Sequence, residues 1–333
     1  MWRKIFLLVC WSSVVSAKTE PLRIYTYESL IGKDSFGELV QREFSKRAGA
    51  EIQFVSFTSA GEALNQVLLE RPHIKADIVM GIDQVLFLRA REYDLFDSVE
   101  NKILKRVETS LKDPQLNGFV PFDFGYLAFV YDSLRTSPPP KATLGEFPGM
   151  LGNQKVVIQD PRTSTLGIEL LIWTGSKLEE QFETFWKGLA PRILTISPGW
   201  SGAYELFLKK QVDYVLSYTT SPAYHRIREN KENIKALLFA DGHFRQVEGL
   251  AVLKSSNQKV LAKKFIELVL EKEIQESIPT LQWMYPARSG ANLPKEFRDI
   301  PVPTKVSMDW NKITAHRDEW TKLWTLILSR EKK

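Results

Sequence analysis

The stretch GFVPFDFGYLAFVYD, residues 118–132, decides how the chain is expected to fold. Its run of Phe, Tyr and Val is too long and too apolar for a surface loop, and it interrupts an alternation of strands and helices. We therefore expect it to cross from one lobe of the protein to another. Residues 247–253 have the composition of a return crossing.

Short apolar runs alternate with helical patterns on both sides of this crossing. Before it, strands are expected at 22–27, 52–57 and 76–80, and Gly49 is expected to end the first helix. After it, a second series of strands starts at 155–158. This order predicts an α/β fold in which each lobe has a mixed, mostly parallel sheet flanked by helices.

The length of 333 residues exceeds what one core comfortably fills, which also favours two lobes. The lobes are expected to have these bounds: lobe 1 at 18–121 and 249–333, lobe 2 at 122–248, with a hinge near 119–126 and 245–252. The last amphipathic helix, near 310–327, is expected to pack on lobe 1.

The N-terminus has the pattern of a secretion signal. Arg3 and Lys4 precede an apolar stretch, and small residues stand at Ser16 and Ala17, so residues 1–17 are expected to be a cleaved signal peptide of an exported, periplasmic protein. The single cysteine, Cys10, lies within it, and a lipid anchor there is disfavoured by the bulky Val9. The mature chain would then hold no thiol or disulfide.

Composition excludes several classes of function. A net charge of +5, with Arg3 and Lys4 supplying two of the positive charges and the rest interspersed, does not indicate a nucleic-acid-binding surface. The sequence carries no GxSxG, P-loop, GxGxxG or HExxH motif, and its four histidines are scattered. We therefore expect a protein that is not an enzyme, with no catalytic residues, no metal site and no cofactor. We also expect it to be a monomer.

Aromatic residues stand at strand ends and helix starts, which is where ligands bind in open α/β sheets. They are Tyr27, Trp200, Tyr218, Tyr224 and Trp283. Their ring faces stack on flat heterocycles and attract cations. Other tryptophans, at helical spacing with Leu and Phe, are assigned to the core: Trp173, Trp186 and Trp320.

Two hydroxyl-rich loops follow strands of the second series. Ser164 and Thr165 stand at a predicted helix start, where hydroxyls and free amides suit an anion or serve as simple caps. The second loop, Tyr218-Thr219-Thr220-Ser221, has the same position after another strand. Two such loops facing one cleft favour a polar ligand site over two unrelated caps.

At these residues the sequence resembles the bacterial periplasmic thiamine-binding proteins. The matching stretches are FVPFDFGYLAFVYD (119–132), QDPRTSTLG (159–167), PGWSGAYELFLK (198–209), DYVLSYTTSPAYH (213–225) and WMYP (283–286). The resemblance spans nearly the whole mature chain. It implies a two-lobed type II periplasmic binding-protein fold and a receptor that binds thiamine, its monophosphate or its diphosphate and delivers it to the membrane permease of an ABC transporter.

The resemblance also implies binding roles where the motifs match. Tyr27, Trp200, Tyr224 and Trp283 resemble the family's aromatic enclosure of the vitamin rings, and Tyr218, Thr219, Thr220 and Ser221 resemble its polar loop. Ser164 and Thr165 resemble its contact at a helix start. Ser59 and Ala60 stand where the family has its first-lobe contact. The last contact departs from the family pattern, which often has an acidic residue and glycine there. The loss of the carboxylate at this position is expected to weaken binding of the cationic thiazolium or to favour the phosphorylated forms of the vitamin.

Three alternatives stay open at this point. A ferric-iron receptor of the same fold could use Tyr218, Tyr224 and His225 as ligands. A polyamine receptor would need carboxylates, for which the candidates are Glu28, Asp83 and Asp123. A thiamine-cleaving enzyme would need a nucleophile, and cysteine is absent after residue 17.

Overall fold

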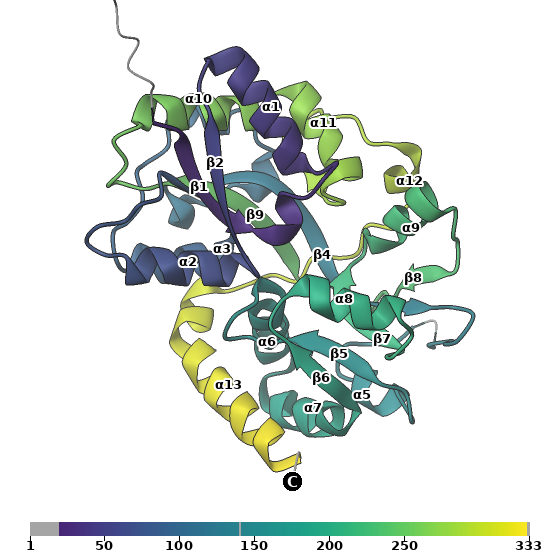
Figure 1. The fold of residues 1–333 in the computed structure, drawn as a ribbon. Helices are drawn as coiled ribbons and strands as arrows, with labels where there is room; N and C mark the ends of the chain where they lie inside the picture. Colours follow the sequence, from purple (N-terminus) through teal and green to yellow (C-terminus); the bar gives the residue numbers. More distant parts are fainter. Residues whose placement is uncertain (1–19, 140, 332–333) are drawn as a thin grey trace, which may run out of the picture.

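The computed structural model describes residues 20–139 and 141–331. Strands and helices alternate along almost the whole of this part, and they form an upper and a lower half in Figure 1. The predicted signal peptide and Cys10 lie outside the described residues. No helix among residues 20–139 and 141–331 is both long and apolar enough to cross a bilayer.

Ten strands and thirteen α-helices make up the described fold. The strands are β1 Leu22–Tyr27, β2 Ile52–Phe57, β3 Ile78–Asp83, β4 Val120–Asp132, β5 Val156–Gln159, β6 Ile193–Ser197, β7 Tyr214–Tyr218, β8 Ile234–Ala236, β9 Arg245–Val252 and β10 Tyr285–Pro286. The helices are α1 Phe36–Ala48, α2 Ala60–Leu69, α3 Gln84–Arg91, α4 Asn101–Leu104, α5 Phe147–Met150, α6 Thr165–Leu178, α7 Phe182–Leu189, α8 Trp200–Leu208, α9 Ser221–Glu229, α10 Lys259–Val269, α11 Lys272–Leu281, α12 Lys295–Arg298 and α13 Trp310–Glu331.

The helix boundaries follow local chemistry. Ser35 accepts a hydrogen bond from the Glu38 amide and so caps the start of α1, and Gly49, at φ 63°, ends the helix in the left-handed conformation. The predicted helix end at Gly49 is therefore confirmed. Asp83 ends β3 and caps α3 by accepting from the Leu86 amide at 2.6 Å.

The strands form one hydrogen-bonded path in the order β2-β1-β3-β9-β4-β7-β5-β6, with β8 and β10 paired to β4. β1 pairs in parallel with β2 and β3, and β5 pairs in parallel with β6 and β7. The two long strands β4 and β9 run antiparallel to each other and join these parallel groups. These two strands coincide with the two predicted crossings. The hinge and the bounds of the lobes stay predictions.

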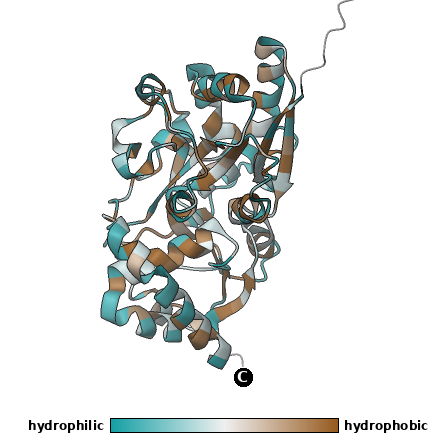
Figure 2. Ribbon diagram, turned by 90° about the vertical axis from the view of Figure 1, so that its left-hand side faces the viewer, coloured by the Kyte–Doolittle hydropathy of each residue, from teal (hydrophilic) through white to brown (hydrophobic). Residues whose placement is uncertain are grey.

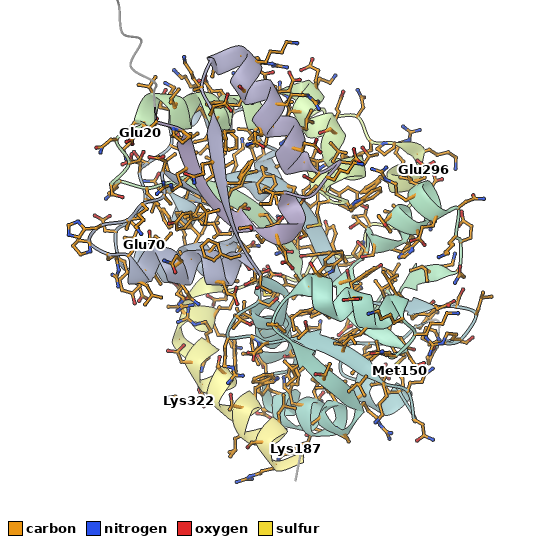
Figure 3. The ribbon with its side chains drawn as sticks, viewed as in Figure 1. Glu20, Glu70, Met150, Lys187, Glu296 and Lys322 are labelled. Carbon is orange, nitrogen blue, oxygen red and sulfur yellow. The ribbon has the colours of Figure 1, made fainter. Side chains whose placement is uncertain are left out.

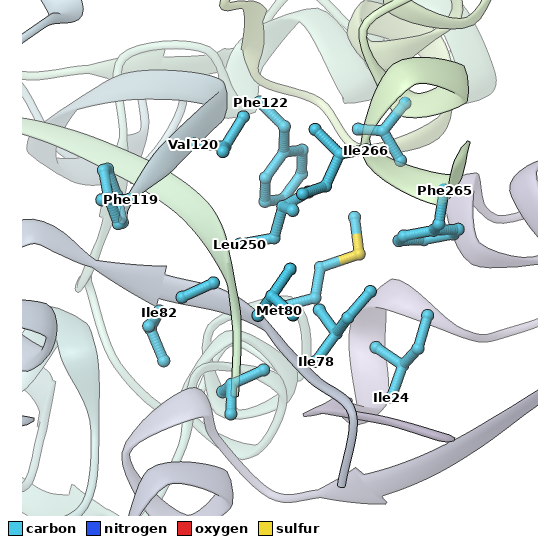
Figure 4. Packing of buried hydrophobic residues seen from close by; sticks show 14 of the residues in the cluster. Ile24, Ile78, Met80, Ile82, Phe119, Val120, Phe122, Leu250, Phe265 and Ile266 are labelled. Atoms are coloured by element: carbon cyan, nitrogen blue, oxygen red, sulfur yellow. The ribbon is translucent and has the colours of Figure 1, made fainter. Parts of the chain in front are cut away.

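Each half has its own core, and the apolar residues gather inside the fold in Figure 2. In the first half, Met80 packs among Ile78, Phe122, Leu250 and Phe265, all of them buried (Figure 4). The second half has a core that includes Trp173 and Trp186, both fully buried. The assignment of Trp173, Trp186 and Trp320 to the core is confirmed.

The last helix differs from the sequence-based expectation, because α13 packs mainly on α6 and α7 of the second half. Its first residue, Trp310, also contacts the first half, where its indole nitrogen donates to Asp113 at 2.9 Å. Trp320 and Trp324 lie on its buried face, while Lys322 points outward (Figure 3). Gly175 of α6 makes the contact with Trp320 possible, since a side chain there would meet the indole at 2.5 Å. Part of the segment 249–333 therefore lies with the second half.

Candidate binding cavity

The carboxyl ends of the parallel strands in the two halves point toward the same region. β1 ends at Tyr27 and β2 at Phe57, while β6 ends at Ser197 and β7 at Tyr218. Ligands of open α/β sheets bind outside such strand ends. A cavity of about 590 Å³ lies there, lined by residues from both halves. Its volume is in the usual range for small-molecule sites.

Ten of the twelve residues predicted from the sequence line this cavity. They are Tyr27, Ser59, Ala60, Ser164, Thr165, Trp200, Tyr218, Ser221, Tyr224 and Trp283. The other two, Thr219 and Thr220, are buried behind the wall and do not line it. Thr219 donates its amide to the Tyr126 carbonyl at 2.9 Å, so its backbone supports the loop.

Trp200 forms one aromatic wall from the start of α8. Its indole nitrogen donates to the Ser217 hydroxyl at 2.9 Å, and its ring stacks on Tyr204 with centroids 4.7 Å apart. Ser217 in turn shares a hydrogen bond of 2.8 Å with Ser221. These contacts hold the indole in a fixed orientation at the edge of the cavity, which reduces the entropy lost on stacking a ligand.

Trp283 forms another wall from the segment after α11. Its φ of 63° is a conformation that bulky residues seldom adopt, and such strain is typical of functional positions. The ring is nearly perpendicular to that of Tyr224, with centroids 4.9 Å apart, and the Arg228 guanidinium lies 5.5 Å from its centroid.

Tyr27 reaches the cavity from the end of β1. Its hydroxyl donates to Glu248 at 2.6 Å and accepts a hydrogen bond from the side-chain amide of Gln282. The ring lies directly over Gly81, where any side chain would overlap it. Burial, followed by the nearby charge of Glu248, raises the pKa of Tyr27 well above its ordinary value, so the phenol stays protonated.

Ser164 and Thr165 lie at the start of α6, where the helix leaves its first amides without helical partners. Ser164 is 3% exposed and its side chain forms no capping hydrogen bond. The hydroxyl and the free amides are therefore available to an acceptor group of a ligand. A negatively charged group is favoured there by the helix dipole.

Ser59 stands where relatives often have an acidic residue, but its hydroxyl is engaged by two backbone groups of the protein. Its side chain accepts from the Glu62 amide, which caps α2, and also donates to the Thr163 carbonyl of the other half. Gly61 and Gly199 allow this approach, since a Cβ on Gly61 would overlap the Thr163 carbonyl and one on Gly199 would come within 2.8 Å of the Thr58 carbonyl. The two halves are thus in direct contact beside the cavity.

Sequence reasoning missed Glu248, which lines the cavity from the middle of β9. It is 5% exposed, and burial raises the pKa of its carboxyl to about 8. A sequence signal was available, because Glu248 is the one charged residue of the apolar stretch 247–253, and a buried carboxylate is costly unless it has a function. Other lining residues that were missed include Lys33, Asp34, Glu205, Arg228 and Gln282.

The alternative ligand sets are incomplete at the cavity. Tyr218 and Tyr224 line it, but His225 and the three candidate carboxylates do not: Glu28, Asp83 and Asp123. His225 is buried and engaged by the Tyr204 hydroxyl and by Glu229, both at 2.9 Å. Among residues 20–139 and 141–331, no group of three His, Cys, Asp or Glu side chains is arranged to hold a metal ion. Asp83 and Asp123 are fully buried beneath the cavity rather than on its wall.

Comparison with known proteins places this geometry in a family. Residues 40–303 match the model for bacterial extracellular solute-binding proteins. The chain belongs to that family. A thiamine-binding periplasmic protein of Salmonella typhimurium is 38% identical over 312 residues, covering 93% of this chain and 94% of the relative.

Solved structures agree with this solute-binding family. A periplasmic thiamin binding protein has a TM-score of 0.87 and 36% identity, and the match covers 96% of this chain and 99% of that one. A ferric binding protein from Campylobacter jejuni, with a TM-score of 0.76 and 17% identity over 92% of this chain and 99% of that one, shares the fold alone. The predicted two-lobed type II fold is confirmed.

Proposed function

We propose that this protein is a periplasmic receptor that binds thiamine, and also its monophosphate and diphosphate, and delivers them to the permease of an ABC transporter. The observation that carries the proposal is the aromatic cavity. Trp200, Trp283, Tyr27 and Tyr224 surround a space that suits flat rings. Thiamine has two such rings, of which one, the thiazolium, is cationic and is attracted to aromatic faces.

The polar groups of the cavity match the rest of the ligand. Glu248 supplies a carboxyl group for the cationic ring, in place of the acidic contact that the Ser59 region lacks. The free start of α6, with Ser164 and Thr165, suits the hydroxyethyl or phosphate end. Lys33 on the wall adds a positive charge that would favour the phosphorylated forms.

Transport requires capture and release, without a covalent step. The ligand would stabilise the state in which the halves touch at Ser59 and Thr163, and the permease would recognise that closed state. We propose accordingly that the protein is not an enzyme, that it acts as a monomer, and that residues 1–17 are removed on export.

Native mass spectrometry of the purified mature protein tests the proposal. A tight receptor retains its ligand through purification, so the released mass should match thiamine or one of its phosphates. The same sample should be assayed for products of thiamine cleavage. An iron adduct, or an empty protein whose tryptophan fluorescence does not respond to thiamine, would contradict the proposal.

A further inference from the structure

Three carboxyl groups lie side by side across adjacent strands beneath the cavity. Glu248 on β9 is the register partner of Asp83 on β3 and of Asp123 on β4. Residues directly opposite each other on paired strands place their side chains on the same face of a sheet. We call Asp83, Glu248 and Asp123 the carboxyl row. Glu248 is the member that reaches the cavity wall.

The row is buried and lacks compensating charge. Asp83 and Asp123 are 0% exposed, and neither carboxyl oxygen of Asp123 has a hydrogen-bond partner in the described part of the chain. Glu169 of α6 is also fully buried, with both carboxyl oxygens unpartnered there. A group of buried acids without a cation is unfavourable, and such a group persists where a function requires it.

The groups that face Glu248 from the surrounding elements are acids, phenols and an amide. They are Tyr27 on β1, Asp83 on β3, Asp123 on β4, Glu169 on α6, Tyr218 on β7 and Gln282 after α11. On β9 itself, the side-chain amide of Gln246 donates to the Glu248 carboxyl at 3.4 Å. The cations on the cavity wall are Lys33 and Arg228, and no ion pair joins either of them to the row among the described residues. The wall also carries Asp34 and Glu205.

Burial is the first cause that raises the pKa values of these carboxyl groups. It raises the pKa of Asp83 to about 6 and that of Glu248 to about 8, and it raises the pKa of Asp123 well above its ordinary value, with the charge of Glu248 adding to the effect. At neutral pH the Glu248 carboxyl therefore holds a proton, whereas Asp83, with a pKa of about 6, is largely ionised. A cation placed beside Glu248 would favour its ionised form, because opposite charges interact strongly where water is excluded.

We propose that Glu248, the member of the carboxyl row on the cavity wall, is the subsite for the positive charge of the ligand, with Asp83 and Asp123 behind it, and that Glu248 gives up a proton to solvent when the cation binds. This inference rests on the proposed function, since thiamine supplies the cation. The proton leaves the Glu248 carboxyl for the buffer, and no bond to the ligand forms or breaks. The row thereby selects cationic ring systems over uncharged ones of the same shape.

Titration calorimetry of thiamine binding in buffers of different ionisation enthalpy tests the inference. The slope of the observed binding enthalpy against the ionisation enthalpy of the buffer gives the number of protons released per thiamine. At about pH 7 we expect a net release of a large fraction of one proton per thiamine. Affinity should rise with pH toward the pKa of about 8, by up to about tenfold per pH unit, and then level off.

Two comparisons isolate the row. The first comparison uses an analogue of thiamine in which an uncharged triazole replaces the thiazolium and the aminopyrimidine is kept. Any proton exchanged at the aminopyrimidine then appears with both ligands. Only thiamine should show the additional proton release from Glu248. Glu248→Gln retains an oxygen that can accept from Tyr27. It should abolish the release and reduce the preference for thiamine over the analogue at least about tenfold.

The outcomes separate the inference from the function it rests on. Failure to bind thiamine in any buffer would overturn the proposed function. Tight binding without proton release, or release that persists in Glu248→Gln, would overturn the inference alone. If Glu248→Gln does not fold, Asp123→Asn is used instead. It removes the acid beside Glu248, so the number of protons released per thiamine at a given pH must change if the two carboxyl groups titrate together.

Discussion

The rings of Tyr224 and Trp283 meet nearly at a right angle, 86° apart in plane and 4.9 Å between centroids. Tyr224 belongs to α9, and Trp283 follows α11, so residues far apart in the sequence form one corner of the cavity. Edge-to-face pairs of this kind contribute about 0.5–1.5 kcal/mol beyond the area they bury. A ligand in the cavity therefore meets a wall that is already assembled.

Replacement of Trp200 should weaken binding, because its ring borders the cavity and is fixed by Ser217 and Tyr204. Trp200→Ala is expected to cost at least about 1 kcal/mol, or roughly a fivefold rise in the Kd for thiamine. Calorimetry measures this directly. Trp310→Ala is the matched control, since Trp310 is also half-buried but lies outside this cavity. Equal effects of the two variants would place Trp200 among purely structural residues.

Gly61→Ala should block closure without harming the fold. The added methyl group would overlap the Thr163 carbonyl only while the halves are in contact. Inserting a methyl group without room costs about 1–3 kcal/mol, so thiamine affinity should fall by a comparable amount. Thermal melting of the ligand-free protein should change little.

Gly149→Ala provides the control for this prediction, since Gly149 is an exposed helical glycine with nothing within 4 Å of the added atom. Small-angle scattering with saturating thiamine should show a compact form for that variant and a more open one for Gly61→Ala. An unchanged affinity in Gly61→Ala would mean that this contact does not form in the bound state.

The stability of the ligand-free protein should fall as pH rises. The carboxyl groups of Asp123, Glu169 and Glu248 have raised pKa values in the folded state, so the folded protein holds protons that the unfolded chain has lost. The stabilisation is complete below about pH 4 and is lost as the pH rises toward about 8, by about 1.4 kcal/mol per pH unit for each proton.

Denaturant unfolding at a series of pH values measures this slope. Asp123→Asn removes one of the protonated acids and should make the slope shallower. A stability that rises steadily between about pH 5 and pH 8 would show that these groups are ionised in the folded protein.

Ser164→Ala should affect the phosphorylated ligand more than thiamine. The Ser164 hydroxyl is buried at the start of α6 and is not used as a cap, so it can donate to a phosphate oxygen. Loss of a hydrogen bond to a charged group costs about 1.5–3 kcal/mol. Competition binding measures the ratio of the Kd values for thiamine monophosphate and thiamine on the same variant. A ratio equal to that of the unmodified protein would show that the phosphate does not bind at the start of α6.

Much of the fold was predictable, because local pattern and strand order determine it. The expected strands 22–27 and 52–57 match β1 and β2 residue for residue. The aromatic residues at strand ends line the cavity because parallel strands bring those ends together. These features depend on periodicity and on the position of a residue within its element.

The features that were missed depend on contacts between distant residues. The periodicity of α13 indicates a buried face but not its partner, which is decided by the space that Gly175 leaves for Trp320. The sequence pattern does not indicate that Thr219 and Thr220, unlike Tyr218 and Ser221, are buried behind the cavity wall, and their role in binding stays a prediction. Glu248 gains its role only from the strands that pair with β9.

The most direct test of thiamine binding by this cavity is a calorimetric titration of the ligand-stripped mature protein with thiamine. We expect saturable binding of one thiamine per chain, and we expect Trp200→Ala to weaken this binding and Trp310→Ala to leave it unchanged. Absence of heat and of any tryptophan fluorescence change at millimolar thiamine, with a folded protein, would contradict the assignment of this cavity to the vitamin.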